Sequence, residues 1–304
     1  MNIHQEGVSS LKRVASLGAW LAISGMLLFP VHGIAQNIIM QDGGSTATLN
    51  FGSGSGNIGM NSWSVNTLNQ SQLNQQWFWY SINGAVAQTI DNLGAVGAPA
   101  TTSGTDGIND VYMVYQGSQL QLGIEYILNG NGAGSGSADI QEYIQIKNVG
   151  SSQISLSFFQ YSNFNLLGGA NDSVSIFGIP YNSNNPFSGY NGAIQTTGTG
   201  GSGIAEVIDA PNANFAEANT VGGLNSTLYK LNNTANLMLN GNPSAGPGDV
   251  TWALQWTATL NSGETLNITK DKGLSLEIVP EPSTVAIIAM GAGALGLALR
   301  RKLS

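Results

Sequence analysis

Apolar and polar residues alternate strictly along several segments of this chain, and this period of two restricts the fold more than any other feature. In VTWALQWTATL, residues 250–260, apolar side chains occupy every second position from Val250 to Leu260. Successive side chains of a β-strand point to opposite faces, so the pattern predicts a strand with one buried face. The alternation recurs in residues 120–128, 144–146 and 154–158.

Turn signals separate these segments. Asn-Gly dipeptides begin at residues 83, 129, 131, 191 and 240, and an Asp-Gly begins at 106. Both pairs are favoured in tight β-turns because their residues tolerate positive φ. Helical periodicity is weak, and its best candidates are PNANFAEAN (211–219) and STLYKLNNTANLM (226–238). Many short strands punctuated by turns predict an all-β domain, a jelly-roll-like β-sandwich.

The N-terminal segment differs from this body. A basic pair at residues 12–13 precedes the apolar run 14–29, and small residues stand before a cut between Ala35 and Gln36. This order of charged, apolar and small-residue regions predicts a secretory signal peptide over residues 1–35. The alternative is an uncleaved N-terminal anchor.

The C-terminal segment combines a Pro-Glu-Pro triplet, an uncharged apolar stretch and a basic cluster. The triplet is Pro280, Glu281 and Pro282, the uncharged stretch is 283–299, and the basic cluster is Arg300, Arg301 and Lys302. As a helix the stretch would span about 25 Å, close to the roughly 30 Å of a hydrocarbon core. Cations at that end favour the cytoplasmic side. We therefore expect a single transmembrane helix within a tail over residues 280–304, the alternative being a buried helix.

The two ends together resemble the PEP-CTERM sorting class of bacterial envelope proteins, which have a signal peptide and such a C-terminal tail. The resemblance implies removal of the leader by signal peptidase and processing of the tail by an exosortase-type membrane protease. It also implies export to the outer surface or extracellular matrix of a Gram-negative-type bacterium, often one that makes exopolysaccharide. Residues 161–178 and 248–282 are similar to uncharacterised ectodomains that carry this tail, and they imply no activity.

Removal of both ends leaves an acidic domain, residues 36–279. It holds fifteen acidic and four basic side chains, a net charge of −11, and it has no His, Arg or Cys. Nucleic acid is excluded as a partner because its binding needs clustered cations, and anionic lipid is disfavoured for the same reason. Catalytic triads, Cys nucleophiles and zinc or copper sites with nitrogen and sulfur ligands are also excluded. We expect no cofactor, and a core that folds without disulfides.

Two kinds of oxygen-based site survive these exclusions. A carboxylate pair for glycoside hydrolysis would have to come from six acids, among which the sequence selects no pair: Glu125, Asp139, Glu142, Glu206, Asp209 and Glu217. Weak calcium candidates are Asp106, Asn109 and Asp110, with Asn171 and Asp172 as a second set. The alternatives are solvated surface acids in the first case and Asx turn chemistry in the second, and we expect no metal.

Aromatic residues gather in QQWFWYSING, residues 75–84. A strand there sets Trp77 and Trp79 on one face and Phe78 and Tyr80 on the other. Tryptophans among amide side chains can stack on sugar rings, but at least one of the two pairs must belong to the core.

The sequence therefore predicts an exported surface or matrix protein that is associated with exopolysaccharide and is not an enzyme. The alternative is a carbohydrate-binding module, or a carboxylate-based glycosidase, that acts on the exopolysaccharide. Both hypotheses assign the function of the exported protein to residues 36–279.

Overall fold

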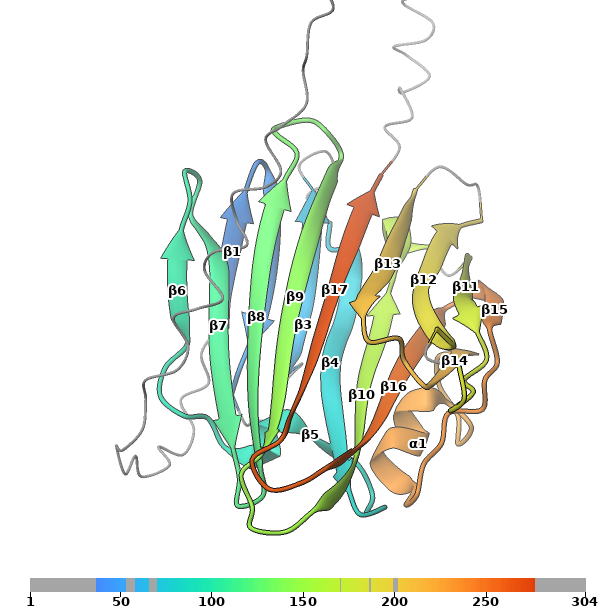
Figure 1. Ribbon diagram of the computed structural model, residues 1–304. Coiled ribbons are helices and arrows are strands. Elements are labelled where there is room, and N and C mark those ends of the chain that lie inside the picture. The colour runs from blue at the N-terminus through green and yellow to red at the C-terminus, as the bar shows by residue number, and fades with distance from the viewer. Residues whose placement is uncertain are drawn as a thin grey trace, which may run out of the picture. The chain divides into compact units, whose positions relative to one another are not determined.

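The chain folds into two antiparallel β-sheets that pack face to face (Figure 1). The computed structural model describes residues 37–52, 58–65, 70–169, 171–185, 187–198 and 202–276. The predicted β-sandwich is confirmed. The predicted signal peptide with its cut at Ala35 and Gln36, the triplet Pro280, Glu281 and Pro282, and the cluster Arg300, Arg301 and Lys302 lie outside the described residues. Within the described ranges, no helix is both long and apolar enough to cross a membrane.

Sheet A contains eight strands in the order β1-β2-β3-β4-β10-β16-β14, with β5 beside β4. They are β1 (Asn37–Asp42), β2 (Ser45–Asn50), β3 (Gly59–Val65), β4 (Leu73–Ile82), β5 (Gln88–Thr89), β10 (Ile154–Phe164), β14 (Phe215–Thr220) and β16 (Val250–Leu260). The middle strand β10 pairs with β4 on one side and with β16 on the other. Sheet A is therefore built from segments that are far apart in the sequence.

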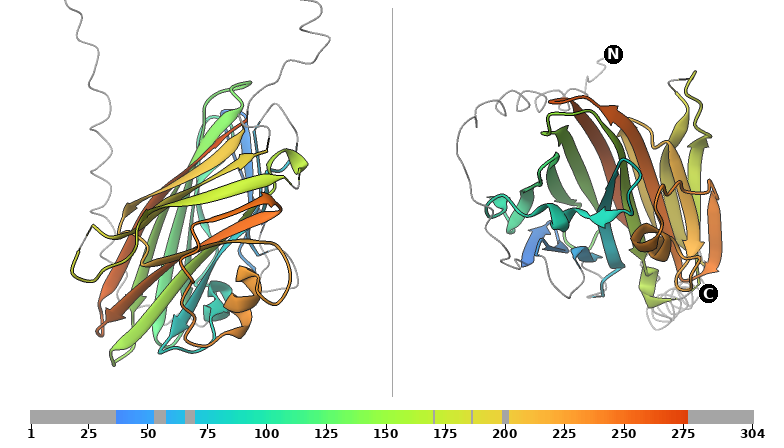
Figure 2. Two further views of the ribbon diagram at one scale, coloured as in Figure 1. Left: turned by 90° about the vertical axis from the view of Figure 1, so that its right-hand side faces the viewer. Right: turned by 90° about the horizontal axis from the view of Figure 1, so that it is seen from below.

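Sheet B contains nine strands in the order β15-β11-β12-β13-β17-β9-β8-β7-β6. They are β6 (Ala100–Ser103), β7 (Ile108–Gln116), β8 (Leu120–Gly130), β9 (Ser137–Asn148), β11 (Asp172–Ile179), β12 (Gly189–Thr197), β13 (Gly203–Ala210), β15 (Ser244–Gly248) and β17 (Thr265–Ser275). Figure 2 shows the two layers from the side and from below. The strands β7, β8 and β9 follow one another as hairpins, whereas β17 joins β9 to β13 across a long gap in sequence.

Alternation along the strands produces the interior. On sheet A, Phe78 stacks on Phe158 with ring centroids 5.4 Å apart, and both side chains are buried. Branched and aromatic residues fill the facing side of sheet B, among them Ile124, Ile144 and Ile268. Such side chains suit a pleated, buried surface, which is why these segments form strands.

The only α-helix among the described residues, α1 (Thr227–Asn233), begins at a cap. The Ser226 hydroxyl accepts a hydrogen bond from the Tyr229 N–H at 3.3 Å, which satisfies one of the free donors of the first turn. The helix bears out the expectation for residues 226–238 in part, over Thr227–Asn233. Two 3-10 helices, η2 (Ile90–Leu93) and η3 (Leu166–Gly168), complete the elements.

Three local expectations from the sequence were wrong. Residues 211–219 are not helical, because most of them form β14, which pairs with β16. The Asn191-Gly192 pair lies inside β12 rather than in a turn. In β16 the polar side is buried from Thr251 to Gln255 and exposed only at Thr257 and Thr259. Gln255 accepts a hydrogen bond from the Leu239 N–H at 2.9 Å and donates to the Leu237 carbonyl at 3.1 Å. The segment after α1 therefore covers a face that was expected to be half exposed.

Candidate functional site

The two tryptophans predicted to stack on sugars belong to the core. Trp77 is 0% exposed and Trp79 is 2% exposed. Trp77 donates its indole N–H to Asp91 Oδ1 at 3.2 Å, and Trp79 donates to Asn232 Oδ1 at 3.0 Å. Because neither ring presents a face to solvent, the structure corrects the stacking prediction in favour of the core alternative.

The weak calcium candidates do not form one group. Asp106 Oδ2 accepts a hydrogen bond from the Gly43 N–H at 2.9 Å. Asn109 and Asp110 lie inside β7, and Asp172 is buried and accepts from the first backbone N–H of η3 at 3.1 Å. Within the described ranges, no three acidic side chains lie close enough together to hold a metal ion. Asp106 and Asp172 therefore accept hydrogen bonds from backbone N–H groups.

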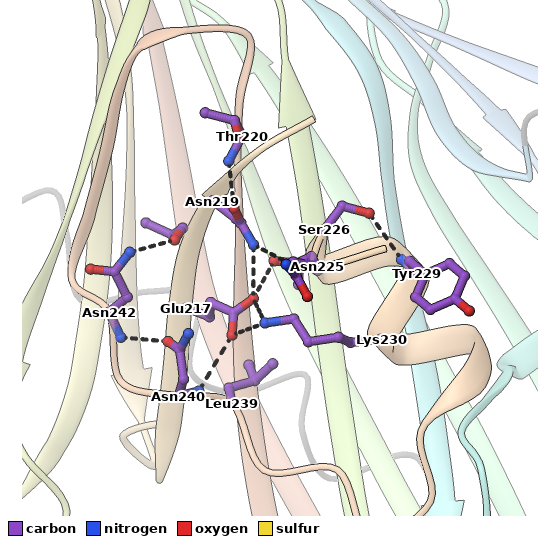
Figure 3. A network of polar contacts seen from close by, with 12 residues as sticks. Glu217, Asn219, Thr220, Asn225, Ser226, Tyr229, Lys230, Leu239, Asn240 and Asn242 are labelled. Carbon is purple, nitrogen blue, oxygen red and sulfur yellow. Dashed lines mark hydrogen bonds and ion pairs between the residues drawn. The ribbon is translucent and has the colours of Figure 1, made fainter. Parts of the chain in front are cut away.

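The six acids considered for a carboxylate pair fall into three places. Glu217 lies beside α1, in the network of Figure 3. Glu142 and Glu206 lie between the sheets, on the inward faces of β9 and β13. The other three, Glu125, Asp139 and Asp209, belong to the opposite phase of β8, β9 and β13, which faces away from sheet A.

Glu217 organises the contact between β14 and α1 (Figure 3). Its carboxylate forms an ion pair with Lys230 and accepts a hydrogen bond from the Thr227 hydroxyl at 2.7 Å. The Asn240 N–H lies 3.4 Å from the same carboxylate. Glu217 is 1% exposed, so all these donors compensate for its burial. This acid therefore has a structural role that anchors the helix.

Four charged residues meet in the interior, and we call Glu142, Glu206, Lys270 and Lys272 the interior quartet. Each is at most 1% exposed. Glu142 pairs with both lysines, and Glu206 Oε1 lies 3.4 Å from Lys270 Nζ and 3.9 Å from Lys272 Nζ. Two cations and two anions balance, which is the condition under which charges tolerate burial.

The quartet perturbs the acidity of its own members. Burial opposes ionisation of Glu142, but the two lysines outweigh it and hold the pKa of that carboxyl below its ordinary value. Burial lowers the pKa of Lys270 to about 8. Burial also acts to lower the pKa of Lys272, but Glu142 and Glu206 outweigh it and raise that pKa above its ordinary value. Lys270 is therefore the lysine that gives up its proton more easily.

The interior holds further polar groups, and one of them, Gln160, contacts the quartet. The Gln160 Nε2 of sheet A donates to both oxygens of Glu206, at 2.8 and 2.7 Å. Several buried polar atoms have no hydrogen-bond partner among the described residues: both polar atoms of the Gln76 side chain, Tyr126 Oη, Gln160 Oε1, Gln195 Oε1 and Trp252 Nε1. The interior of the sandwich therefore contains buried polar groups besides the quartet.

The outer face of sheet B carries a different arrangement. Tyr112 of β7, Glu125 of β8 and Tyr143 of β9 are direct cross-strand neighbours and form one row. Two strand spacings, roughly 9–10 Å, separate the tyrosines. Tyr143 is 39% exposed. The row therefore offers aromatic side chains with a carboxylate between them.

Gly123 shapes this row. A Cβ atom at position 123 would lie only 2.5 Å from the Tyr112 hydroxyl oxygen and 3.2 Å from its ring carbon Cζ. The Tyr112 ring therefore leans across the backbone of β8, into space that any other residue would fill. A ring that lies along the sheet keeps the surface flat, and a flat aromatic surface suits a planar apolar face of a ligand.

Acidic side chains surround the row, and their charges raise the pKa values of neighbouring groups. Burial raises the pKa of Glu125, and the nearby Asp110 raises it further. Burial, with Asp139 and Asp209, raises the pKa of Asp271. Burial and then Glu125, Asp271 and Asp209 raise the pKa of Tyr143. We call the surface formed by Tyr112, Glu125, Tyr143, Asp110 and Asp271 the tyrosine face.

Sequence reasoning included Glu125 and Asp110 among its candidates but missed Tyr112 and Tyr143. A signal was present, since both tyrosines stand at polar positions of alternating strands. An aromatic residue on the solvent-facing side of a strand has an exposed ring. What the sequence did not show is that the two tyrosines and Glu125 fall in one row.

Comparison with known proteins identifies the C-terminal signal first. Residues 279–302 match the PEP-CTERM protein-sorting motif. The chain thus carries a PEP-CTERM sorting motif, a signal that indicates an exported protein sorted to the cell surface and implies processing by an exosortase. No curated protein matches the chain.

Solved structures resemble the fold at low identity. A galactose mutarotase-like protein from Lactobacillus casei is 10% identical, with a TM-score of 0.44 over 79% of this chain and 100% of that one. An aldose epimerase homologue from C. elegans is 8% identical, with a TM-score of 0.45 over 80% and 100%. A bacterial glucoamylase complexed with acarbose is 9% identical, with a TM-score of 0.48 over 87% and 36%. These similarities concern the fold alone.

The comparisons correct the functional expectation. The sequence predicted a surface or matrix protein without catalytic activity, but the solved structures found include a putative aldose 1-epimerase, an aldose epimerase homologue and a galactose mutarotase-like protein. Both the non-catalytic assignment and the prediction that the chain is not an enzyme are therefore contradicted.

Proposed function

We propose that the exported domain binds a polysaccharide on the outer face of sheet B. The observation that carries this proposal is the row Tyr112–Glu125–Tyr143 on three adjacent strands. Aromatic rings contact the apolar faces of sugar rings, and carboxylates accept hydrogen bonds from sugar hydroxyls. The exopolysaccharide of the producing cell is the ligand we propose, because the chain is sorted to the surface where that polymer lies.

Neighbouring amides extend the polar part of this surface. Gln145 Nε2 donates to Asn267 Oδ1 at 3.3 Å, and both residues are exposed beside Tyr143. On the other side of the row, Asn129 Nδ2 donates to Asp139 Oδ2 at 3.0 Å. Paired amides and carboxylates hold their remaining donors and acceptors in fixed directions, as recognition of hydroxyl groups requires.

Glycoside hydrolysis is a second candidate function, favoured by Asp110 and Glu125. The register makes them diagonal neighbours, with a backbone separation of roughly 7–8 Å. Burial and the Asp110 charge raise the pKa of Glu125, and an acid with a raised pKa next to a second carboxylate is the arrangement that glycosidases use. Glu125 would then be the general acid.

A glycan array screened with the purified full-length chain tests the first proposal. Affinity electrophoresis in gels that contain the positive polysaccharide then compares Tyr143→Ala with Tyr229→Ala. The two tyrosines are matched in exposure, 39% and 41%, but Tyr229 lies on α1. We expect Tyr143→Ala to weaken binding about tenfold, a loss of roughly 1.4 kcal/mol, and Tyr229→Ala to leave it unchanged.

Two results would count against these proposals. If the two tyrosine variants bound the polysaccharide equally well, the tyrosine face would not be the binding site. A reducing-sugar assay on the same polysaccharide tests hydrolysis: release of reducing ends that Glu125→Gln abolishes supports a glycosidase. If no polysaccharide that binds the protein released reducing ends, hydrolysis would be rejected and carbohydrate binding would remain the proposed function.

A further inference from the structure

Glu206 of the interior quartet touches an amine and an amide at once. Its Oε1 lies 3.4 Å from Lys270 Nζ and 2.8 Å from Gln160 Nε2. Gln160 belongs to β10 of sheet A, whereas Glu206 and Lys270 belong to β13 and β17 of sheet B. A single buried carboxylate thus brings together a nucleophile and an acyl group from opposite sheets.

Phe78 provides a second measure of this proximity. Lys270 Nζ lies 5.1 Å from the centroid of the Phe78 ring. Phe78 and Gln160 are direct cross-strand partners on β4 and β10, and such partners have Cβ atoms about 4.5–5.5 Å apart. The amine of Lys270 therefore crosses the interior and reaches the pair of strands that carries Gln160.

We propose that Lys270 and Gln160 condense into an intramolecular isopeptide bond that crosslinks the two sheets, with Glu206 as the proton carrier. This inference is independent of carbohydrate binding. It assigns a chemical role to a cluster whose complete burial, at most 1% exposure for each member, leaves it inaccessible to a polysaccharide.

The reaction balances without any co-reactant. Lys270 Nζ first loses a proton to Glu142, with which it forms an ion pair. The neutral amine attacks Gln160 Cδ, so that an Nζ–Cδ bond forms and the carbonyl electron pair moves to Oε1. Glu206 carries a second proton from Nζ to Nε2. The electron pair on Oε1 then re-forms the carbonyl while the Cδ–Nε2 bond breaks, and Nε2 leaves with the bonding electrons as ammonia.

Local chemistry favours Lys270 over Lys272 as the nucleophile. Burial lowers the pKa of Lys270 to about 8, which increases the fraction of neutral amine, whereas the two glutamates raise the pKa of Lys272. Lys270 Nζ is also the nearer of the two to Glu206 Oε1. The Gln160 Oε1 that would receive the electron pair is buried and has no hydrogen-bond partner among the described residues.

A peptide map of the purified full-length protein tests the proposal. Trypsin cleaves after lysine, and the lysines of the described residues are Lys147, Lys230, Lys270 and Lys272. The expected product is a branched peptide that joins residues 148–230 to residues 231–272, lighter than the sum of its parts by one ammonia and uncut after Lys270. Separate recovery of unmodified 148–230 and 231–270 in most molecules would overturn the proposal.

Two features of the map exclude other origins of a mass loss. A leader cut before Gln36 leaves an N-terminal glutamine that can cyclise with the same loss of ammonia, but that change stays in the peptide that begins at residue 36. Loss of one water instead of ammonia would place the bond on an aspartate or a glutamate and overturn the role of Gln160.

Variants then test the assigned roles by mass alone. Gln160→Ala and Lys270→Arg should each lack the branched peptide, and Lys147→Arg, at an exposed lysine, should keep it. Glu206→Gln should leave most molecules uncrosslinked if Glu206 carries the proton. If Lys270→Arg kept the crosslink, another lysine would form the bond and the assignment to Lys270 would be wrong.

Discussion

The indole of Trp252 stacks on the ring of Phe164, with centroids 5.4 Å apart and planes 9° from parallel. Phe164 ends β10 and Trp252 lies near the start of β16, so the contact joins two central strands of sheet A. Both side chains are 0% exposed. The stack therefore combines aromatic geometry with complete burial, which makes it one of the main contributions to the core.

Truncation of this stack should be among the costliest changes in the domain. We expect Trp252→Ala to lower the free energy of unfolding by about 3–5 kcal/mol, because it removes a buried aromatic side chain and leaves a cavity. Thr257→Ala, at an exposed position of the same strand, should change it by less than about 0.5 kcal/mol. Urea unfolding compares the two variants. Equal midpoints would contradict the strand phase described for β16.

The contact between α1 and sheet A should depend on Glu217. Glu217→Ala removes the partner of the partly exposed Lys230 and of the buried Thr227 hydroxyl. We expect a loss of roughly 2–3 kcal/mol, because buried polar groups are left unpaired. Lys230→Ala should cost less, about 1 kcal/mol, since Glu217 keeps its hydrogen bonds and Lys230 is partly exposed.

Urea unfolding at neutral pH measures both changes at Glu217 and Lys230. A matched control is Glu264→Ala, an exposed acid bonded only within its own turn. If Glu217→Ala cost no more than this control, the network in Figure 3 would have no stabilising role.

Acids on the tyrosine face should make stability depend on pH. Burial raises the pKa of Asp110 in the folded chain, so the native state binds that proton more tightly than the unfolded state does. Ionisation of Asp110 therefore costs stability, and this cost develops as pH rises from about 4, the ordinary Asp value, through the raised pKa. Asp110→Asn should thus increase the free energy of unfolding at pH 7, by less than about 1 kcal/mol because the site is half open to solvent.

The sign of this effect separates it from a general effect of charge removal. At pH 3 the acid is protonated in both states, so Asp110→Asn and the parent should there unfold at similar urea concentrations. Glu264 is the control of opposite sign, because the backbone and side-chain N–H groups of Asn261 lower its pKa. Glu264→Gln should lower stability at pH 7. A pH-independent gain from Asp110→Asn would contradict the pKa explanation.

Local alternation made much of the fold predictable. Residues 250–260 were expected to form a strand and do form β16. The burial of Gln255 was not predictable, because it depends on residues 237–239, which return to β16 after α1. The strand over 215–220 was missed because its partner is supplied by β16, and tertiary pairing outweighs a weak local preference.

The candidate sites were predictable to different degrees. In β9 and β13, Glu142 and Glu206 each stand between isoleucines in the apolar phase, which is a local signal of buried charge. That Lys270 would lie between them was not predictable, because β17 enters between β9 and β13 from the end of the domain. The tyrosine row comes from consecutive hairpins, but its use as a surface depends on the outer face of sheet B remaining uncovered.

Processing of the C-terminal tail is the last prediction. The sorting motif matches residues 279–302. Proline fixes its own φ and disfavours the helical region for the residue before it, so the Pro-Glu-Pro sequence predicts an extended stretch that a membrane protease can bind. We predict cleavage within residues 280–283 after export. Neutral substitution of the basic cluster, Arg300, Arg301 and Lys302, should weaken retention, because cations oppose translocation of that end. Mass spectrometry of the surface protein measures the cut. Recovery of peptides that reach Ser304 from most molecules would show that the tail is a permanent anchor.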